Sequence, residues 1–267
     1  MPGSAGLVGA LVWRTRREGV RQILATFLPF VGVMAITVGT ALWSSGHGIN
    51  GRAAFAAFAT RYGATADSVA VGIALLLWPA LVALFAAMAV ASAVRNLVGA
   101  EATRGAMEAL LAMPYSPATL VDGLLIYAGL MATVFWCGMM VVAAIGFALV
   151  LRVTGASIHL TTTYVAMAAV LPLLSSWAAG ALALLVDLLA PKLAQLGGYG
   201  IMGGPGGLAS LPPALPALGV LFLFVIGASH MSAAALLLVA GGAVAVIIVA
   251  TVVAVARGFR PESILGA

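Results

Sequence analysis

Charge is the scarcest property of this 267-residue chain: only 7% of its residues are Asp, Glu, Lys or Arg, and Lys192 is the single lysine. A water-soluble domain carries about 25% charged residues. So few charges could not cover a globular surface, which excludes a soluble enzyme or binding module. Intrinsic disorder is excluded by the hydrophobic content of 64%. The composition therefore predicts a polytopic membrane protein.

Cysteine is almost absent as well, since Cys137 stands alone inside an apolar run. A single cysteine excludes a disulfide framework and a CxxC metal or redox motif. We interpret Cys137 as a buried hydrophobic residue rather than as a soft-metal ligand. The three histidines, His47, His159 and His230, fall in separate loops, so their spacing predicts no shared metal site.

The chain also lacks the short motifs of enzymes and nucleotide-binding proteins. It has no GxSxG elbow, no HExxH pair and no glycine-rich loop followed by Lys and Ser or Thr. We interpret the glycine-rich stretch 197–207 as a flexible connector. We therefore expect no catalytic residue, no bound metal and no cofactor in this chain itself.

Long apolar runs are abundant, and a helix needs about 20 apolar residues to cross a bilayer. The six runs that qualify are 23–43, 69–94, 120–151, 164–189, 211–228 and 232–256. They predict an all-α membrane protein, a single transmembrane domain over residues 1–267. The fifth run has Pro212, Pro213 and Pro216 near its start, so a broken or re-entrant segment is the alternative there.

The basic residues predict how these spans are oriented. Nine lie before the first span or after the second, fourth and sixth, and only Arg52, Arg61 and Arg152 lie on the opposite side. The positive-inside rule then places both termini in the cytoplasm, and the basic excess is a topology signal rather than a nucleic-acid interface. Ahead of the first span, Leu7, Leu11 and Trp13 precede a cluster of arginines, which predicts an amphipathic helix lying on the inner leaflet. A frayed basic tail is the alternative.

No charged residue falls at the centre of a span. Asp122 and Asp187 lie at the cytoplasmic ends of the third and fourth spans, where Arg95, Arg104 or Lys192 could pair with them. The uncharged polar clusters within or next to spans are candidates for lining a translocation pathway: Thr37, Thr40, Trp43, Ser175, Ser176 and Trp177. The alternative is that their hydroxyl groups bond to their own helix backbone or hold neighbouring helices together.

The segment between the second and third spans carries the most information. On a helix, Glu101, Arg104 and Glu108 form one polar stripe, and Arg104 and Glu108 are spaced to pair. An apolar stripe containing Leu110 and Leu111 lies beside it. A short helix of this kind, parallel to the membrane, is either a docking element or an interfacial helix with no partner. Pro114 ends the helix, and Ser116-Pro117 predicts the start of the next one.

The order Glu-x-x-Arg-Gly-x-x-Glu-x-Leu-Leu-x-x-Pro-x-Ser over residues 101–116 resembles the cytoplasmic loop of type-2 ATP-binding-cassette (ABC) exporter permeases. In that family the loop also follows the second of six spans. Leu120 and Gly123 continue the similarity, whereas Thr103 and Leu124 stand where the family often has a second acid and a lysine. The loop motif covers about 23 residues, and the six-span topology extends the resemblance to the whole chain.

The resemblance implies a multi-pass permease subunit of a bacterial plasma (inner) membrane, paired with a second permease half as a homodimer or heterodimer. Two soluble ATPase subunits would bind ATP and Mg. The residues that would form the coupling helix are Glu101, Arg104, Gly105, Glu108, Leu110, Leu111, Pro114 and Ser116. The cargo would be hydrophobic or amphipathic: a lipid, a drug or a peptide. The alternatives are an ATP-independent carrier or channel and, less favoured, a membrane-embedded enzyme.

Overall fold

The computed structural model describes residues 4–46, 52–64, 69–103, 116–189, 207–227 and 231–259, and these parts are almost entirely helical. The helices are α1 (Ser4–Gly46), α2 (Arg52–Arg61), α3 (Val69–Thr103), α5 (Pro117–Thr154), α6 (Thr162–Leu189), α8 (Gly207–Phe222), the π-helical turn η1 (Leu223–Gly227) and α9 (Ala233–Gly258). Across these ranges, paired β-structure is limited to one isolated bridge between Ala64 and Ile158. The predicted all-α fold is confirmed for the described residues.

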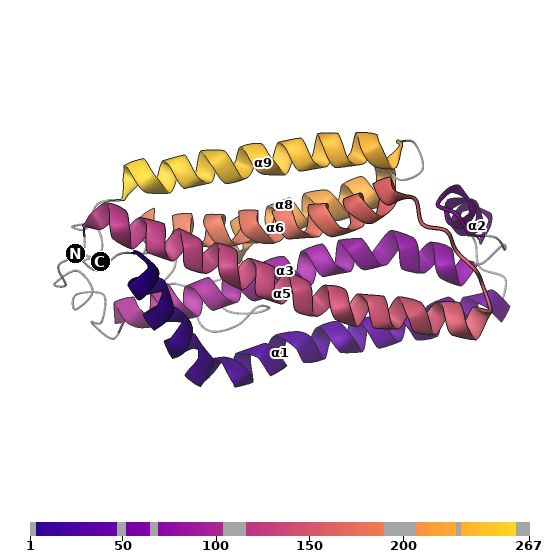
Figure 1. Ribbon diagram of the computed structural model, residues 1–267, viewed down its shortest axis with the longest axis horizontal. Coiled ribbons are helices and arrows are strands. Elements are labelled where there is room, and N and C mark those ends of the chain that lie inside the picture. Colours follow the sequence, from indigo (N-terminus) through magenta and orange to yellow (C-terminus); the bar gives the residue numbers. More distant parts are fainter. Residues whose placement is uncertain are drawn as a thin grey trace.

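The long helices lie side by side in one elongated bundle, and α2 lies across one end of it (Figure 1). We call that end the α2 end, and the opposite one, where α3 ends and α5 begins, the α3–α5 end. The start of α1 and the ends of α6 and α9 also lie at the α3–α5 end (Figure 1). Two close contacts agree with this, because Gly123 of α5 packs on Leu7 of α1 and Gly258 of α9 packs on Leu189 of α6.

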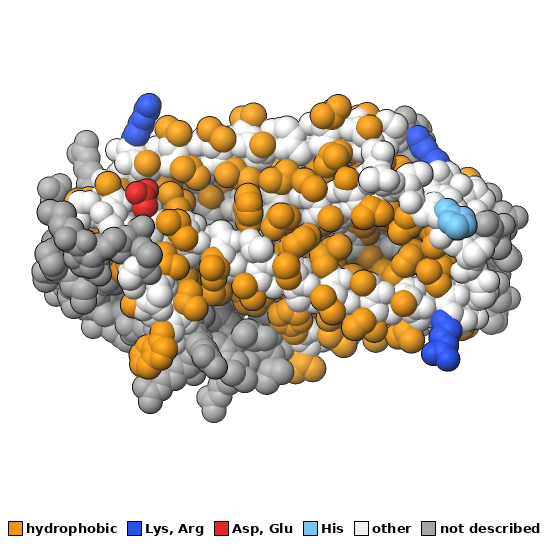
Figure 2. All heavy atoms as spheres, viewed as in Figure 1, with side chains coloured by type: hydrophobic (Ala, Val, Ile, Leu, Met, Phe, Trp, Pro, Cys, Tyr) orange, Lys and Arg blue, Asp and Glu red, His pale blue; other side chains and the backbone are white. Residues whose placement is uncertain are grey.

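The outer surface of the bundle is an apolar belt with its charges at the two ends. Figure 2 shows hydrophobic side chains along the middle of the visible face and charged ones only near its ends. On α5, the exposed face between Asp122 and Arg152 carries large apolar side chains such as Ile126, Val134 and Ile145. These two charges are 30 residues apart on one helix, or about 45 Å, which leaves room for a bilayer core of about 30 Å.

Four helices are long and apolar enough to cross a membrane: Val69–Leu97, Pro117–Thr154, Thr162–Leu189 and Ala233–Gly258. They contain the predicted second, third and fourth spans and all of the sixth except Ser232, and together with the apolar belt they make this a membrane protein. In the predicted first and fifth spans the described apolar stretches are shorter, Phe27–Thr40 and Pro212–Phe222. A count of six membrane crossings therefore stays a prediction.

The helix ends follow local sequence rules. Ser116 is the N-cap of α5, with its hydroxyl oxygen accepting a hydrogen bond from the Thr119 backbone N–H at 3.1 Å, and Pro117 is the first helical residue. This confirms the start predicted from Ser116-Pro117. At the other end Gly155 has a φ of 65°, the left-handed conformation that commonly terminates helices. With 38 residues, α5 is about 57 Å long and extends beyond the lipid core on geometry alone.

The N-terminal part of α1 is the region predicted as an amphipathic interfacial helix. It is continuous with the first apolar run rather than separate from it, and Figure 1 shows that α1 changes direction between its start and its longer second part. Leu7 and Leu11 are buried, whereas Trp13 is 67% exposed. One face of this turn of helix is therefore packed on the bundle and the other is open, as an interfacial helix requires.

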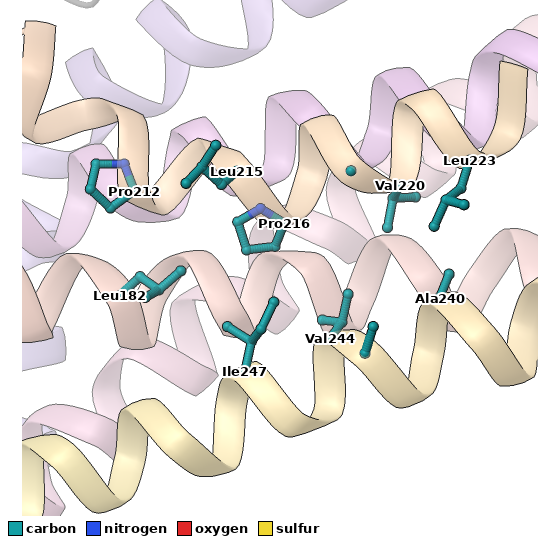
Figure 3. Close-up of a pocket in the computed structure, with 11 residues that line it drawn as sticks. Leu182, Pro212, Leu215, Pro216, Val220, Leu223, Ala240, Val244 and Ile247 are labelled. Carbon is teal, nitrogen blue, oxygen red and sulfur yellow. The ribbon is translucent and has the colours of Figure 1, made fainter. Parts of the chain in front are cut away.

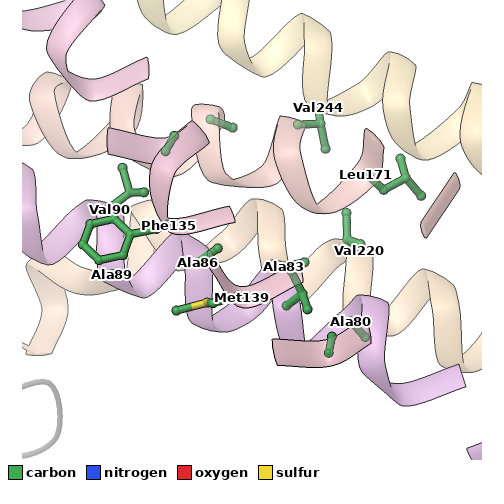
Figure 4. Close-up of a cluster of buried hydrophobic side chains, with 14 of the residues drawn as sticks. Ala80, Ala83, Ala86, Ala89, Val90, Phe135, Met139, Leu171, Val220 and Val244 are labelled. Carbon is green, nitrogen blue, oxygen red and sulfur yellow. The ribbon is translucent and has the colours of Figure 1, made fainter. Parts of the chain in front are cut away.

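The core is built around α3, which packs against α1, α2, α5, α6 and α8. Its buried residues are rich in alanine, and Figure 4 shows Ala80, Ala83, Ala86 and Ala89 within the cluster of buried side chains. Small side chains let helix backbones approach closely, which is how helices associate in lipid, where there is no water to expel. As a result α3 is more deeply buried than α5 or α9, whose outer faces are exposed.

Pro79 interrupts the backbone hydrogen bonding of α3, and a side chain on another helix repairs the interruption. Proline has no N–H, so the carbonyl four residues earlier, that of Leu75, loses its helical donor. The hydroxyl group of Tyr164 on α6 donates to this Leu75 carbonyl at 2.5 Å. Within a membrane an unpaired backbone carbonyl is costly, so this bond stabilises both the proline-containing turn and the contact between α3 and α6.

At the α2 end, α2 and the turn after it are fixed by contacts with four other parts of the chain. The α2 backbone at Phe55 lies directly over Gly72 of α3, and the His159 backbone N–H donates to the Gly63 carbonyl at 3.0 Å. The Arg61 guanidinium donates to the Met231 carbonyl. The ring of Tyr62 packs on Phe58 and Tyr164, and burial raises the pKa of its hydroxyl group although nearby Arg61 lowers it. Tyr62 therefore stays neutral at physiological pH.

Candidate functional site

The predicted coupling segment 101–116 joins α3 to α5 at the α3–α5 end of the bundle. Glu101 lies in the last turn of α3, and Ser116 caps α5. The remaining predicted coupling residues, Arg104, Gly105, Glu108, Leu110, Leu111 and Pro114, lie outside the described residues, so the helical form of the segment stays a prediction. Its two attachment points are nevertheless fixed by the structure.

These attachment points connect the segment to the centre of the molecule. The deeply buried α3 leads into the segment, and α5, which leaves it, packs against α1, α3 and α6. Near the start of α5, Leu120, Val121 and Leu124 are buried, so this part of the helix is held in the bundle from its first turns. A displacement of the segment would therefore act directly on two packed helices.

The same end holds a buried ion pair between α3 and α6. Arg95 Nε and Asp187 Oδ1 are 4.0 Å apart, and the side chains are 24% and 2% exposed. The sequence offered three partners for Asp187: Arg95, Arg104 and Lys192. The structure brings Arg95 and Asp187 together, whereas Arg104 and Lys192 lie outside the described residues. Asp122, the second acid considered, is exposed at the start of α5.

The two predicted polar clusters lie on different helices that have few contacts with each other. Thr37, Thr40 and Trp43 are on α1, whereas Ser175, Ser176 and Trp177 are on α6. Because α1 packs on α3 and α5, and α6 packs mainly on α3, α5, α8 and α9, the clusters do not form one lining. Trp43 is exposed on the outer side of α1.

The hydroxyl groups of both clusters bond to their own helices. On α1, Thr37 donates to the Val33 carbonyl at 2.6 Å. On α6, Ser175 and Ser176 are fully buried and donate to the carbonyls of Leu171 and Pro172, each at 2.7 Å. The alternative interpretation expects such bonds to the helix backbone. That these residues line a translocation pathway stays a prediction.

Trp177 makes a contact of a different kind. Its indole N–H donates to the hydroxyl oxygen of Thr133 on α5 at 3.1 Å, so it ties α6 to α5. The Thr133 hydroxyl in turn donates to the Gly129 carbonyl of its own helix. Thr133 was not singled out from the sequence, and a lone threonine inside an apolar run gives no signal of a partner on another helix.

An apolar pocket of about 310 Å³ lies between α6, α8 and α9 (Figure 3). Its walls include Leu182 of α6, Pro216 and Val220 of α8, and Val244 and Ile247 of α9. All eleven lining residues are apolar or glycine. The sequence did not predict this pocket, although the prolines and Gly219 on α8 mark a helix with little side-chain bulk. The arrangement can hold an apolar group and has no polar atom positioned for chemistry.

The residues considered for metal binding are dispersed. His159 is exposed in the connection from α5 to α6, and His47 and His230 lie outside the described residues. Within the described ranges, no three His, Cys, Asp or Glu side chains come together.

Cys137 is exposed, so the prediction that it is buried is wrong. It lies on the same face of α5 as the exposed Val134 and Val141, at spacings of three and four residues, and this face belongs to the apolar belt.

Comparisons with protein-family models, curated proteins and solved structures gave no match to this chain.

Proposed function

We propose that this chain is the membrane-spanning permease subunit of a type-2 ABC exporter, with six spans and both termini in the cytoplasm. ATP is hydrolysed by separate soluble ATPase subunits, and a second permease half completes the transporter. The observation that carries the proposal is the 101–116 motif, Glu-x-x-Arg-Gly-x-x-Glu-x-Leu-Leu-x-x-Pro-x-Ser. It stands between two helices that are packed into an apolar, membrane-type bundle.

The distribution of charge supports the proposed orientation. Arg61 and Arg152 lie toward the α2 end, whereas Arg95 and Arg257 lie toward the α3–α5 end, where the arginine-rich part of α1 also begins. When the remaining basic residues are assigned to the two ends from their place in the sequence, most of the basic residues fall at the α3–α5 end. The positive-inside rule assigns that end to the cytoplasm. The coupling segment then faces the compartment that contains ATP.

The mechanism follows from the two attachment points of the segment. Glu101, Arg104 and Glu108 make polar contacts with the ATPase, Leu110 and Leu111 hold the segment against the bundle, and Gly105 allows close approach. Closure of the ATPase on ATP displaces the segment, and α3 and α5 pass this movement to the helices packed on them. The pocket between α6, α8 and α9 supports a hydrophobic or amphipathic cargo, because its walls offer only apolar contacts.

The experiment that tests this function is a measurement of ATPase activity in reconstituted membranes. We expect the purified chain to bind an ATPase that carries a Walker A motif and to stimulate its turnover. Changing Arg104 and Glu108 together to alanine removes two charged contacts of the segment and should reduce the stimulation at least about fivefold, the low end of a loss of coupling of 1–3 kcal/mol.

A matched control is the Asp122→Asn variant, which removes an exposed charge from the start of α5, outside the segment. This variant should insert into membranes and stimulate the ATPase like the unaltered chain. Full stimulation by the Arg104, Glu108 double variant, or transport by the purified chain without any ATPase, would contradict the proposal and favour an ATP-independent carrier.

A further inference from the structure

The ion pair between Arg95 and Asp187 is poorly bonded for its degree of burial. Asp187 is 2% exposed, yet neither of its carboxylate oxygens has a hydrogen-bond donor among the described residues. The Nε and one terminal nitrogen of Arg95 are also buried without an acceptor. The shortest approach between the two groups, 4.0 Å, is too long for a hydrogen bond.

Such a pair contributes little to stability. Transferring two charges from water into the protein costs free energy. Their mutual attraction offsets this cost only when the geometry is close and the remaining polar atoms are hydrogen-bonded. Replacing such a pair by apolar residues is often neutral or stabilising. Ionisable residues within membrane helices are correspondingly rare and tend to have a functional role. The described bundle holds Arg95 and Asp187 as its only buried pair of opposite charges, so stability alone does not account for them.

The position of the pair relates it to the coupling segment. Arg95 is six residues before Glu101, the first residue of the segment, or about 9 Å along the helix, and Asp187 is two residues before the end of α6. About two turns further into the bundle, α3 and α6 are in close contact, where Gly180 packs on Val90. A methyl group added at Gly180 would lie 2.9 Å from a methyl group of Val90. The contact of Gly180 with Val90 is therefore a tight crossing point of α3 and α6 deeper in the bundle, and the loosely bonded ion pair lies nearer the α3–α5 end.

We propose that Arg95 and Asp187 form a coupling latch that holds the ends of α3 and α6 together in the resting state and opens when the segment 101–116 is displaced. The two opposite charges attract each other at 4.0 Å, and because no hydrogen bond to a described residue holds either carboxylate oxygen of Asp187, none of these bonds has to break when the pair separates. The tight crossing at Gly180 and Val90 stays fixed and serves as the pivot. Arg95 and Asp187 are thus positioning residues, and this proposal rests on the proposed permease function.

The test measures whether the distance between the two positions changes with nucleotide state. In a Cys137→Ala background, Arg95→Cys and Asp187→Cys are introduced together, and a bis-methanethiosulfonate with a two-carbon spacer is applied to the reconstituted complex with its ATPase. Cross-linking should be efficient without nucleotide and fall at least about fivefold after trapping with ATP and vanadate, the low end of typical coupling factors. Equal yields in the two states would overturn the latch.

A control pair on the same two helices is Ala87→Cys with Ala179→Cys. Both alanines are fully buried and pack together inside the crossing point, so a direct disulfide between these positions should form equally in both states. A nucleotide-dependent yield at this pair too would mean that the helices separate along their whole length, which contradicts a pivot at Gly180.

A second measurement separates a latch from a purely structural pair. Arg95→Met with Asp187→Leu removes both charges and should preserve the thermal stability of the chain while reducing the stimulation of the ATPase about fivefold or more. Arg95→Asp with Asp187→Arg restores the attraction and should recover most of the stimulation. Full stimulation by the neutral double variant would overturn the proposal.

Failure of the permease function gives a different result from failure of the latch. If no ATPase binds the chain, the permease function falls, and the latch falls with it, even though the cysteine pair still cross-links without nucleotide. If an ATPase binds and is stimulated while the cross-linking yields stay equal, only the latch is wrong.

Discussion

At the scale of single residues, the hydrogen bonds of the hydroxyl groups inside the bundle could be predicted from the sequence only in part. Threonine and serine hydroxyl groups bond to carbonyls of their own helix, which local geometry alone dictates. The sequence offered Arg95 as one of three possible partners of Asp187, and the packing of α3 on α6 brings these two residues together. The bond from Tyr164 to Leu75 was not, because it depends on how α3 and α6 are rotated toward each other.

We predict that the Tyr164→Phe variant loses about 1–3 kcal/mol of unfolding free energy, because it leaves the buried Leu75 carbonyl without a donor. The reason is specific to Pro79, so the effect should shrink to nearly zero in a Pro79→Ala background. Alanine at position 79 supplies the N–H that bonds to Leu75 within α3. Unfolding curves of the four proteins of this double-mutant cycle, in one detergent, measure the coupling.

Equal losses from Tyr164→Phe in the two backgrounds would contradict this explanation. They would show that the hydroxyl group stabilises the bundle independently of the proline.

At the scale of helices, hydrophobic run length predicted the elements well and their boundaries less well. Four of the six predicted runs lie within one helix, and the other two, 211–228 and 232–256, extend by one residue beyond η1 and the start of α9, because consecutive apolar residues can satisfy their backbone only as helix in lipid. The helices continue beyond the runs, as α3 does to Thr103, since helical hydrogen bonding does not stop where apolarity stops. The short α2 was missed because its ten residues are too few for a span and its alanines carry no clear periodic signal.

The packing of α2 on α3 should depend on the absence of a side chain at Gly72. A Cβ atom at this position would lie 2.0 Å from the backbone carbonyl oxygen of Phe55, so α2 would have to move away. We predict that Gly72→Ala lowers the unfolding free energy by about 1–3 kcal/mol, as overpacking does elsewhere. Thermal unfolding in detergent micelles measures this loss.

The matched control is Gly242→Ala on the exposed side of α9, where no atom lies within 4 Å of the added methyl group. This variant should show no loss, because alanine favours helix over glycine. A loss of equal size in both variants would show that the contact with Phe55 is not what limits position 72.

At the scale of the whole molecule, the structure shows where the few charged residues lie. The described charges lie toward the two ends of the bundle, the middle is an apolar belt, and the buried pair Arg95–Asp187 marks the end from which the coupling segment leaves. Composition was enough to predict the membrane environment. The pocket between α6, α8 and α9 could not be predicted, because it arises from how three separate helices fit together.

The central claim is that residues 101–116 dock onto a soluble ATPase, and photo-cross-linking in intact cells tests it most directly. A photoreactive phenylalanine analogue replaces Ala112, which continues the predicted polar stripe one turn after Glu108 and leaves Arg104 and Glu108 in place. The control places the same analogue at Gly219 of α8, which lines the apolar pocket away from the segment and has nothing within 4 Å of an added Cβ atom. We predict an adduct between position 112 and an ATPase with a Walker A motif, and none from position 219. No ATPase adduct from position 112, or the same adduct from both positions, would contradict the claim.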